Sequence, residues 1–309
     1  MTAHSSATRP KRSPLSTASN GLWWGLLGVL AFSFTVPLTR VVVADGALSP
    51  LFVGAGRAVV AAALAALALI CTRQPRPRGR QWLRLAVVAA GVVAGFPLLT
   101  SYALTAVPAN HGAVVIALLP AATAVLAARR GNERPPRRFW LLAGLGAVLA
   151  VGFAALSGGG ALVGLRAADL LLLGAVLAAA IGYAEGGLLA RELGSWQTIS
   201  WALVISTPVM LALTLVSIAR QPPAASLGQW AVFGYLSAVS MFLGFFAWYR
   251  GLALGPMSRV SQVQLVQPVF SIAWAALLLG EPLTWSVVLG GLAVIGCAAL
   301  AVRARLAPR

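Results

Sequence analysis

The sequence contains little charge, and acidic residues are the scarcest of all. Only 9% of the 309 residues are charged, with six Asp and Glu against 23 Lys and Arg, whereas about a quarter of the residues are charged in an ordinary soluble domain. Hydrophobic residues make up 60% of the chain. This composition excludes a normal soluble domain and predicts a membrane protein.

Lysine, histidine and cysteine are nearly absent, and each absence excludes a class of chemistry. The sole lysine, Lys11, lies in the polar N-terminal segment, so no phosphate-binding Gly-Lys-Ser/Thr loop is present. His4 and His111 lack the spacing of a zinc hydrolase motif. Two cysteines, Cys71 and Cys297, make a disulfide framework unexpected. We therefore expect no ATP hydrolysis, no metal or other cofactor, and no enzyme activity.

Long apolar runs follow one another with short interruptions. A membrane-spanning helix needs about 20 mostly apolar residues, and the chain contains ten such runs. They cover residues 21–40, 49–71, 83–106, 108–128, 139–157, 167–190, 196–219, 228–254, 257–280 and 284–302. The sequence therefore predicts an all-α membrane protein with ten transmembrane helices.

The basic residues fall on one side of this predicted membrane. With a cytoplasmic N-terminus, 19 of the 23 lie in inner segments, three (Arg40, Arg166 and Arg220) lie at outer loops, and Arg57 lies inside a span. Because Lys and Arg accumulate in cytoplasmic loops, both termini are predicted to be cytoplasmic. The net charge of +17 is then an orientation signal that anionic membrane lipid reinforces, and it does not indicate a nucleic-acid partner.

Residues 107–133 and 255–281 resemble each other at a constant offset of 148. The aligned pairs are Pro108 and Pro256, Pro120 and Pro268, and Glu133 and Glu281. Coincident landmarks of this kind indicate a duplicated unit. Each unit then holds five spans, and an odd number of spans inserts the second unit in the opposite orientation. Two such inverted five-helix repeats surround one central site in many secondary transporters.

The repeat divides the chain into two units with polar ends. We expect a disordered cytoplasmic tail at residues 1–20, because this segment is polar, basic and rich in Ser, Thr and Pro. The first repeat is expected at 21–157, an outer linker at 158–166, the second repeat at 167–303, and a cytoplasmic tail at 304–309.

The ninth run, SRVSQVQLVQPVFSIAWAALLLGEP (258–282), carries glutamines in an otherwise apolar segment. At 100° per residue, an 80° arc of this helix contains Gln264, Gln267, Ser271 and Trp274. Unsatisfied amides in hydrocarbon cost several kcal/mol, so this stripe must face other helices or a wet cavity. It either lines a substrate site, which is our working hypothesis, or locks the bundle through interhelical hydrogen bonds.

The aligned prolines Pro120 and Pro268 lie in the middle of their predicted helices. A proline frees the carbonyl four residues earlier and allows the helix to bend, so both are candidate hinges. The first repeat has Ile116 and Leu119 where the second has Gln264 and Gln267. Polar recognition is therefore expected mainly from the second half.

Two charged residues within the predicted spans are further candidates. Arg57 lies about eight residues, or roughly 12 Å, from the outer end of its helix. It either binds a substrate carboxylate or phosphate or makes a structural bond to carbonyls or to a carboxylate. Glu185 lies about five residues from the cytoplasmic end of the sixth run, where it either carries a proton during antiport or reaches the interface.

Aromatic residues complete the candidate substrate-binding set. Tyr102 in the third run and Trp248 and Tyr249 in the eighth are suited to line a pocket for an amphipathic ligand. The alternative is packing or an interfacial belt. His111, at the outer start of the fourth run, is expected to be a satisfied interfacial residue.

The ten-span pattern, the duplicated segment with its proline, and the stretch LLLGEPLTWSVVLGGLAVIG (277–296) resemble the drug/metabolite transporter superfamily, specifically its EamA branch of bacterial permeases. GRAVVAAAL, from Gly56, is similar to that family's second span, and the resemblance covers residues 21–303. The first repeat departs from the pattern, because it has Arg129-Arg130-Gly131-Asn132 before Glu133 instead of apolar residues.

This resemblance implies export or exchange of small metabolites, such as amino acids or drug-like compounds, across the cytoplasmic membrane. A secondary transporter working by alternating access is the resulting hypothesis. Two alternatives stay open, a channel-like pore and a non-transporting ligand-binding protein. The matched prolines and the lack of charged rings argue against the channel.

Overall fold

The computed structural model describes residues 14–130, 136–156, 166–254, 260 and 263–306, and all regular structure in these ranges is helical. The first half contains α1 (Pro14–Ser33), α2 (Thr35–Val43), α3 (Pro50–Cys71), α4 (Gln81–Val88), η1 (Ala89–Gly95), α5 (Phe96–Ala106), α6 (Ala109–Ile116), α7 (Leu119–Arg130) and α8 (Arg137–Leu156). The second half contains α9 (Ala167–Leu193), α10 (Ser195–Arg220), α11 (Leu227–Tyr235), η2 (Leu236–Leu243), α12 (Gly244–Leu254), η3 (Gln264–Val266), α14 (Gln267–Leu279) and α15 (Trp285–Leu306).

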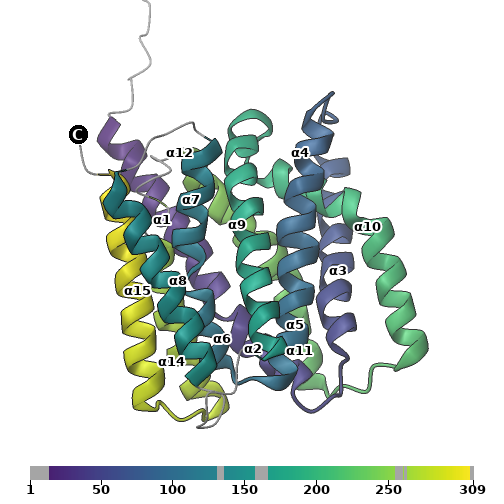
Figure 1. The fold of residues 1–309 in the computed structure, drawn as a ribbon. Coiled ribbons are helices and arrows are strands. Elements are labelled where there is room, and N and C mark those ends of the chain that lie inside the picture. Colours follow the sequence, from purple (N-terminus) through teal and green to yellow (C-terminus); the bar gives the residue numbers. More distant parts are fainter. Residues whose placement is uncertain (1–13, 131–135, 157–165, 255–259, 261–262, 307–309) are drawn as a thin grey trace, which may run out of the picture.

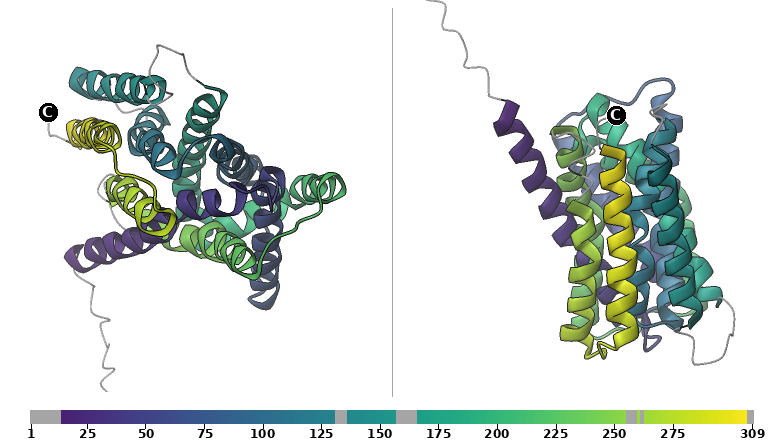
Figure 2. Two further views of the ribbon diagram at one scale, coloured as in Figure 1. Left: turned by 90° about the horizontal axis from the view of Figure 1, so that it is seen from below. Right: turned by 60° about the vertical axis from the view of Figure 1, so that its left-hand side comes forward.

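Many of these helices are long and apolar enough to cross a membrane. Within the described residues seven segments meet that criterion: Gly21–Val43, Pro50–Cys71, Gln81–Ala106, Ala109–Leu126, Ala167–Leu193, Ser195–Arg220 and Leu227–Leu254. Two apolar helices are shorter, Gln264–Leu279 and Trp285–Ala301, and the 20-residue α8 packs along α15. The helices run side by side from one end of the molecule to the other (Figures 1 and 2).

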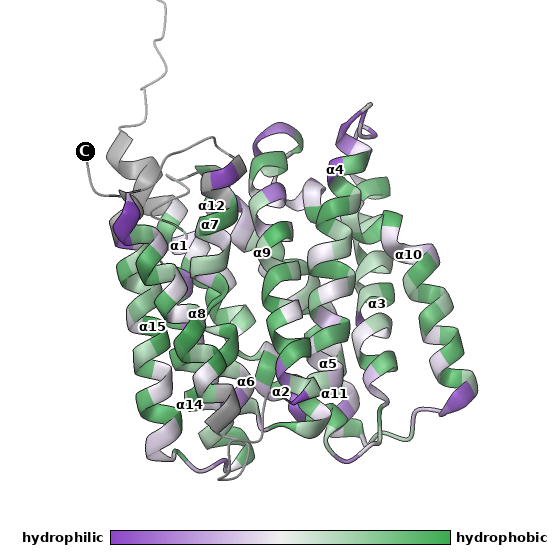
Figure 3. Cartoon of the chain, in the orientation of Figure 1, coloured by the Kyte–Doolittle hydropathy of each residue, from purple (hydrophilic) through white to green (hydrophobic). Residues whose placement is uncertain are grey.

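The outer surface of this bundle matches a lipid environment. Hydrophobic residues dominate its sides, and hydrophilic residues gather toward the two ends (Figure 3). Leu141, Val148 and Leu292 are 64–73% exposed on α8 and α15, where water would make them costly. The chain is therefore a multi-pass membrane protein.

The order of elements recurs after 148 residues. Helices α5 and α12 each contain 11 residues, and both of their bounds differ by 148. Each follows a π-helical segment, η1 in the first half and η2 in the second. Helices α7 and α14 begin at Leu119 and Gln267, again 148 residues apart.

The two proline-containing helices are broken just before the proline. In the first half α6 ends at Ile116 and α7 begins at Leu119, and in the second half the 3₁₀ turn η3 precedes α14. Pro120 and Pro268 are the second residues of α7 and α14. A proline lacks an N–H and its ring clashes with the carbonyl four residues earlier, so the structure has a break where the sequence predicted a bend.

The structure differs from the sequence-based expectation at both ends. Helix α1 begins at Pro14, so residues 14–20, expected to be disordered, are helical; proline is favoured in the first turn of a helix. Helix α15 continues to Leu306, three residues into the expected C-terminal tail. Residues 1–13, Glu133 and nearly all of the expected linker, at 158–165, lie outside the described residues.

Helix α9 holds the two halves together. It packs against α4, η1, α5, α6 and α7 of the first half and against α10 and α12 of the second. One continuous cluster of buried apolar side chains includes residues from most of these helices. Cys71 and Cys297 are both free, and Cys71 is exposed.

Candidate functional site

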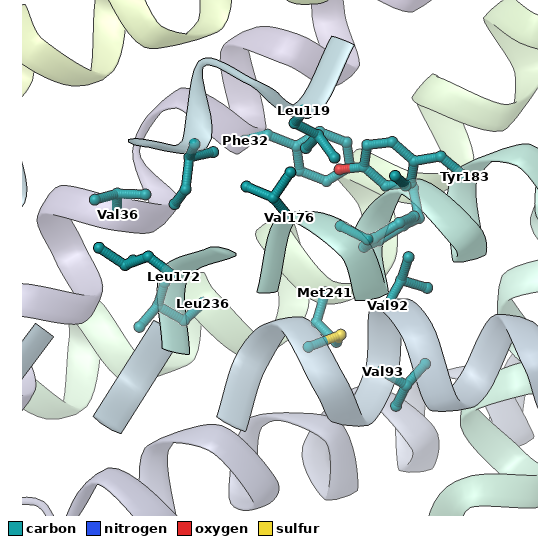
Figure 4. Close-up of a cluster of buried hydrophobic side chains, with 14 of the residues drawn as sticks. Phe32, Val36, Val92, Val93, Leu119, Leu172, Val176, Tyr183, Leu236 and Met241 are labelled. Atoms are coloured by element: carbon teal, nitrogen blue, oxygen red, sulfur yellow. The ribbon is translucent and has the colours of Figure 1, made fainter. Parts of the chain in front are cut away.

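A small cavity lies among helices from both halves. Its apolar lining consists of Phe32, Val92, Phe96, Pro97, Ala179, Met241 and Phe245. Its polar lining consists of Thr35, Arg57, Tyr183, Ser240 and Gln267. Figure 4 shows Phe32, Tyr183, Val92 and Met241 in this region. An apolar lining with a few polar groups is typical of small-molecule pockets.

Irregular helical segments of both halves meet at this cavity. Val92 belongs to η1, Ser240 and Met241 belong to η2, and Gln267 is the first residue of α14 after the break. π-Helical segments occur frequently at functional sites, because the extra residue changes which side chains face a neighbour. The duplicated distortions of the fold are therefore concentrated where the cavity lies.

Arg57 of α3 is the charged residue of the cavity lining. Its side chain is fully buried, and its three guanidinium nitrogens make no hydrogen bond to any part of the chain that the structure describes. The structural bond that the sequence left open as an alternative is thus not formed within these residues. Arg57 is instead a buried guanidinium in the cavity wall.

Gln264 and Gln267 are buried and face equivalent residues of the first half. A second, smaller cavity lies between the two broken helices. Its lining includes three pairs of residues that are 148 apart: Ile116 and Gln264, Leu119 and Gln267, and Pro120 and Pro268. Gln267 borders both cavities. Among the described residues, both amide atoms of Gln264 and the Oε1 of Gln267 have no hydrogen-bond partner.

Ser271 and Trp274, the other half of the predicted stripe, have a different role. The Ser271 hydroxyl donates to the Ser33 carbonyl at 2.8 Å, and the Trp274 indole donates to the Ser33 hydroxyl at 3.1 Å. The Trp274 ring also stacks on Phe34 with 4.4 Å between centroids. These contacts brace the break between α1 and α2. The predicted stripe therefore has two parts. The two glutamines line the cavities, whereas Ser271 and Trp274 stabilise the break between α1 and α2. Ser271 also borders the smaller cavity.

The three predicted aromatic residues do not border either cavity. Tyr102 is 43% exposed on the surface of the bundle. Trp248 and Tyr249 are fully buried, and the Tyr249 hydroxyl donates to the Gly182 carbonyl at 3.2 Å. The three aromatic residues were selected because they are aromatic and lie in apolar runs. Residue type alone does not define the face of the helix on which a side chain lies. We therefore leave Tyr102, Trp248 and Tyr249 out of the site.

Several lining residues were missed by the sequence reasoning. Thr35 and Ser240 approach each other across the two halves, with 2.7 Å between their hydroxyl oxygens. The ring of Tyr183 stacks on Phe32 at 6.3 Å between centroids. Single hydroxyl groups inside apolar spans were the available signal, because each needs a polar partner or a wet cavity there.

Glu185 lies deeper than predicted. Helix α9 continues to Leu193, so Glu185 is eight residues from its end rather than about five, and it is 2% exposed. Burial excludes a side chain that simply reaches the interface. Glu185 binds the guanidinium of Arg84 on α4, which also binds Glu192. These ion pairs join the two halves at one end of the bundle, outside the cavity lining.

The opposite end has its own contacts between halves. The carboxylate of Glu281 accepts hydrogen bonds from the backbone N–H of Ala109 at 2.7 Å and of Asn110 at 2.8 Å. A carboxylate is favoured at a helix N-terminus, where the N–H groups lack partners. Asp169 lies 2.7 Å from the Nε2 of His111, so His111 is a satisfied buried residue as expected.

The loop between α2 and α3 is tied to α11 at the same end. The carboxylate of Asp45 accepts hydrogen bonds from the Ala47 N–H at 3.0 Å and from the Gln229 side chain at 2.6 Å. The backbone hydrogen bond, followed by the Gln229 contact, lowers the pKa of Asp45. The carboxylate is therefore charged at neutral pH.

Comparison with known proteins places these features in a family. Residues 19–156 and 166–303 each match the EamA-like transporter family. The protein YdeK of Bacillus subtilis (strain 168), described as an uncharacterized transporter, is 43% identical over 289 residues, covering 94% of this chain and 99% of YdeK. A chain in a crystal structure has a TM-score of 0.64 at 17% identity and covers 93% of this chain and 98% of its own length; it supports the overall fold alone.

Proposed function

Because this chain belongs to the EamA-like transporter family, and so is a membrane transporter and not an enzyme, we propose that it is a secondary transporter. It exports a small metabolite or drug-like compound across the bacterial cytoplasmic membrane by alternating access. The observation that carries this proposal is the cavity lined by irregular segments of both halves, with buried polar side chains that have no partner within the described residues. Discontinuous helices at a repeat interface are the usual place of a transporter's substrate site.

The proposed topology has ten membrane spans in two inverted halves, at 21–157 and 167–303, with both chain ends in the cytoplasm. Two observations support it. The order of elements recurs after 148 residues, and the equivalent helices α7 and α14 end at opposite ends of the bundle in Figure 1. The ion pairs of Arg84 then lie at the cytoplasmic end and the Glu281 contacts at the outer end. Alternate separation of these two sets of contacts would open the cavity to one side at a time, with Pro120 and Pro268 as hinges.

Cysteine accessibility tests this topology. In a background with Cys71→Ser and Cys297→Ser, we expect Ala224→Cys to react with a membrane-impermeant maleimide on intact cells, because the loop between α10 and α11 is proposed to be outside. Arg78→Cys, between α3 and α4, should react only after permeabilisation. The reverse pattern would exclude the proposed orientation.

Counterflow in proteoliposomes tests the transport mechanism. Amino acids, nucleosides, organic acids and cationic drugs are loaded inside in turn, and entry of labelled tracer is followed. We expect one class to drive saturable accumulation. The double variant Gln264→Ala/Gln267→Ala should lower the rate at least tenfold, because a tenfold change needs only about 1.4 kcal/mol of lost substrate contact. The matched control Gln221→Ala/Gln229→Ala, at the C-terminal cap of α10 and in the first turn of α11, borders neither cavity and should retain the rate.

The other two hypotheses predict different results in the same experiment. A channel gives flux without saturation or counterflow. A ligand-binding protein gives no flux, although ligands still raise its melting temperature. If the double variant Gln264→Ala/Gln267→Ala transports at the wild-type rate, these two residues do not belong to the substrate site.

A further inference from the structure

The positive charge of Arg57 has no acidic counterpart in the part of the chain that the structure describes. Five of the six acidic residues are described, and each has another partner: Asp45 with Ala47 and Gln229, Asp169 with His111, Glu185 and Glu192 with Arg84, and Glu281 with Ala109 and Asn110. None of the five borders the cavity. The sixth, Glu133, lies outside the described residues.

The energetic cost of this arrangement indicates what binds there. A buried charge without a partner is strongly unfavourable in a low-dielectric interior. A guanidinium group presents its N–H donors in a planar fork that matches the two oxygens of a carboxylate or a related oxyanion. Arg57 has all three nitrogens buried and unpartnered among the described residues, and it borders the cavity between the two halves.

Building on the transport function proposed above, we propose that the substrate is an organic anion whose oxyanion group binds Arg57 in the larger cavity. The remaining cavity wall defines the rest of this substrate. Phe32 and Phe245 lie 4.8 Å apart between ring centroids, and Tyr183 stacks on Phe32. Together with Met241 they form an apolar wall that suits a hydrocarbon or aromatic body.

The polar part of the cavity lining disfavours cationic and zwitterionic ligands. An ammonium group needs an anionic or strongly polar acceptor when it is desolvated. The described lining offers only neutral oxygens, those of Thr35, Tyr183, Ser240 and Gln267. Binding a cation beside Arg57 would add repulsion between like charges. The expected order of affinity is therefore anion first, then zwitterion, then cation.

The experiment measures binding to the purified full-length protein in nanodiscs with ligands that share one aromatic body. These are 3-phenylpropionate, 2-phenylethanesulfonate, 3-phenylpropionamide, phenylalanine and 2-phenylethylamine. We expect the two anions to raise the melting temperature with saturation. The amide and the amine should bind at least tenfold more weakly. Equal affinity for 3-phenylpropionate and its amide would overturn the proposal, because the charge would then contribute nothing.

Variants at Arg57 separate binding from structure. Arg57→Gln should weaken binding of 2-phenylethanesulfonate at least tenfold without weakening the amide, whereas Arg78→Gln, at an exposed site, should change neither. Arg57→Met should fold and, without ligand, melt no lower than wild type, because it removes a buried unpaired charge. A large loss of stability in Arg57→Met would show that the guanidinium holds the fold together and would overturn the assignment.

Counterflow distinguishes failure of this inference from failure of the transport function. Labelled 2-phenylethanesulfonate is a suitable tracer, since it stays ionised and crosses lipid poorly. Saturable counterflow of cations or neutral compounds, with no response to anions, would overturn the substrate class and leave the transporter proposal intact. Anion binding that depends on Arg57, with no counterflow by any class, would support the site and overturn the transport mechanism.

Discussion

Replacing Gly91 by valine is expected to unfold the protein or to lower its free energy of unfolding by at least about 3 kcal/mol, the upper end of ordinary overpacking costs. A Cβ atom at Gly91 would overlap the carbonyl oxygen of Ala178 and would lie 2.9 Å from the backbone nitrogen of Gly182. These are backbone atoms of α9, so no change of rotamer can relieve the overlap. The helix α9 must move away from η1.

The matched control for this substitution is Gly144→Val on α8. Gly144 has no atom within 4 Å of an added Cβ and is exposed at the side of the bundle, so valine there should leave the melting temperature within a few degrees of wild type. Thermal unfolding in detergent and the yield of monodisperse protein provide the comparison. A Gly91→Val protein that melts like wild type would show that η1 and α9 do not pack as described.

Transport should respond to the same change. Val92 follows Gly91 and borders the larger cavity, as does Ala179 of α9. Separation of η1 from α9 would widen the cavity between them. We expect any folded fraction of Gly91→Val to lose saturable counterflow.

Replacing Arg84 by methionine is expected to destabilise the protein by about 3 kcal/mol, the lower end of the range for removing one partner of a buried ion pair. The lower end applies because Arg84 is 29% exposed, whereas Glu185 is 2% exposed. Without Arg84, the charged form of Glu185 loses its cationic partner in the interior.

A double-mutant cycle isolates this interaction. Arg84→Met/Glu185→Leu should recover part of the stability that Arg84→Met loses, because it removes both charges together. The matched pair Arg84→Met/Glu192→Leu should recover none, because Glu192 is 45% exposed. Equal recovery in the two double variants would show that the deep pair contributes no more than the exposed one.

Proton coupling through Glu185, one of the two roles that the sequence left open for it, is tested with the same residues. Protonation of Glu185 would leave Arg84 bound to Glu192 alone and would loosen the contact between α4 and α9. An imposed pH gradient should accelerate uptake into wild-type vesicles and into the Glu192→Gln variant. Glu185→Gln should transport at a rate independent of the gradient, and a persistent response would exclude coupling through Glu185.

Part of the candidate site could be predicted from the sequence. Gln264, Gln267 and Arg57 were selected because polar groups in an apolar span need a reason to be there, and all three border a cavity. The resemblance to the EamA family is confirmed by the match of both halves. The depth of Glu185 was misjudged because the end of α9 was placed too early, at residue 190 instead of Leu193.

Other features depended on contacts that no sequence pattern contains. Tyr102 and Tyr183 are both tyrosines in apolar helices, yet Tyr102 faces outward and Tyr183 borders the cavity. Ser271 was expected beside the glutamines, but it donates to Ser33, which is 238 residues away in the chain. Which side chains meet depends on how helices rotate and break against one another.

The sequence by itself determined that this protein is a helical membrane protein with a duplicated plan, because hydrophobicity, proline positions and basic loops are local properties of the chain. Only the tertiary structure decided that Arg57 and Gln267, 210 residues apart, border one cavity, and that the acidic residues described are engaged elsewhere. The reason is physical. The charge balance and shape of a cavity belong to the packed arrangement of many helices, and no single helix contains them.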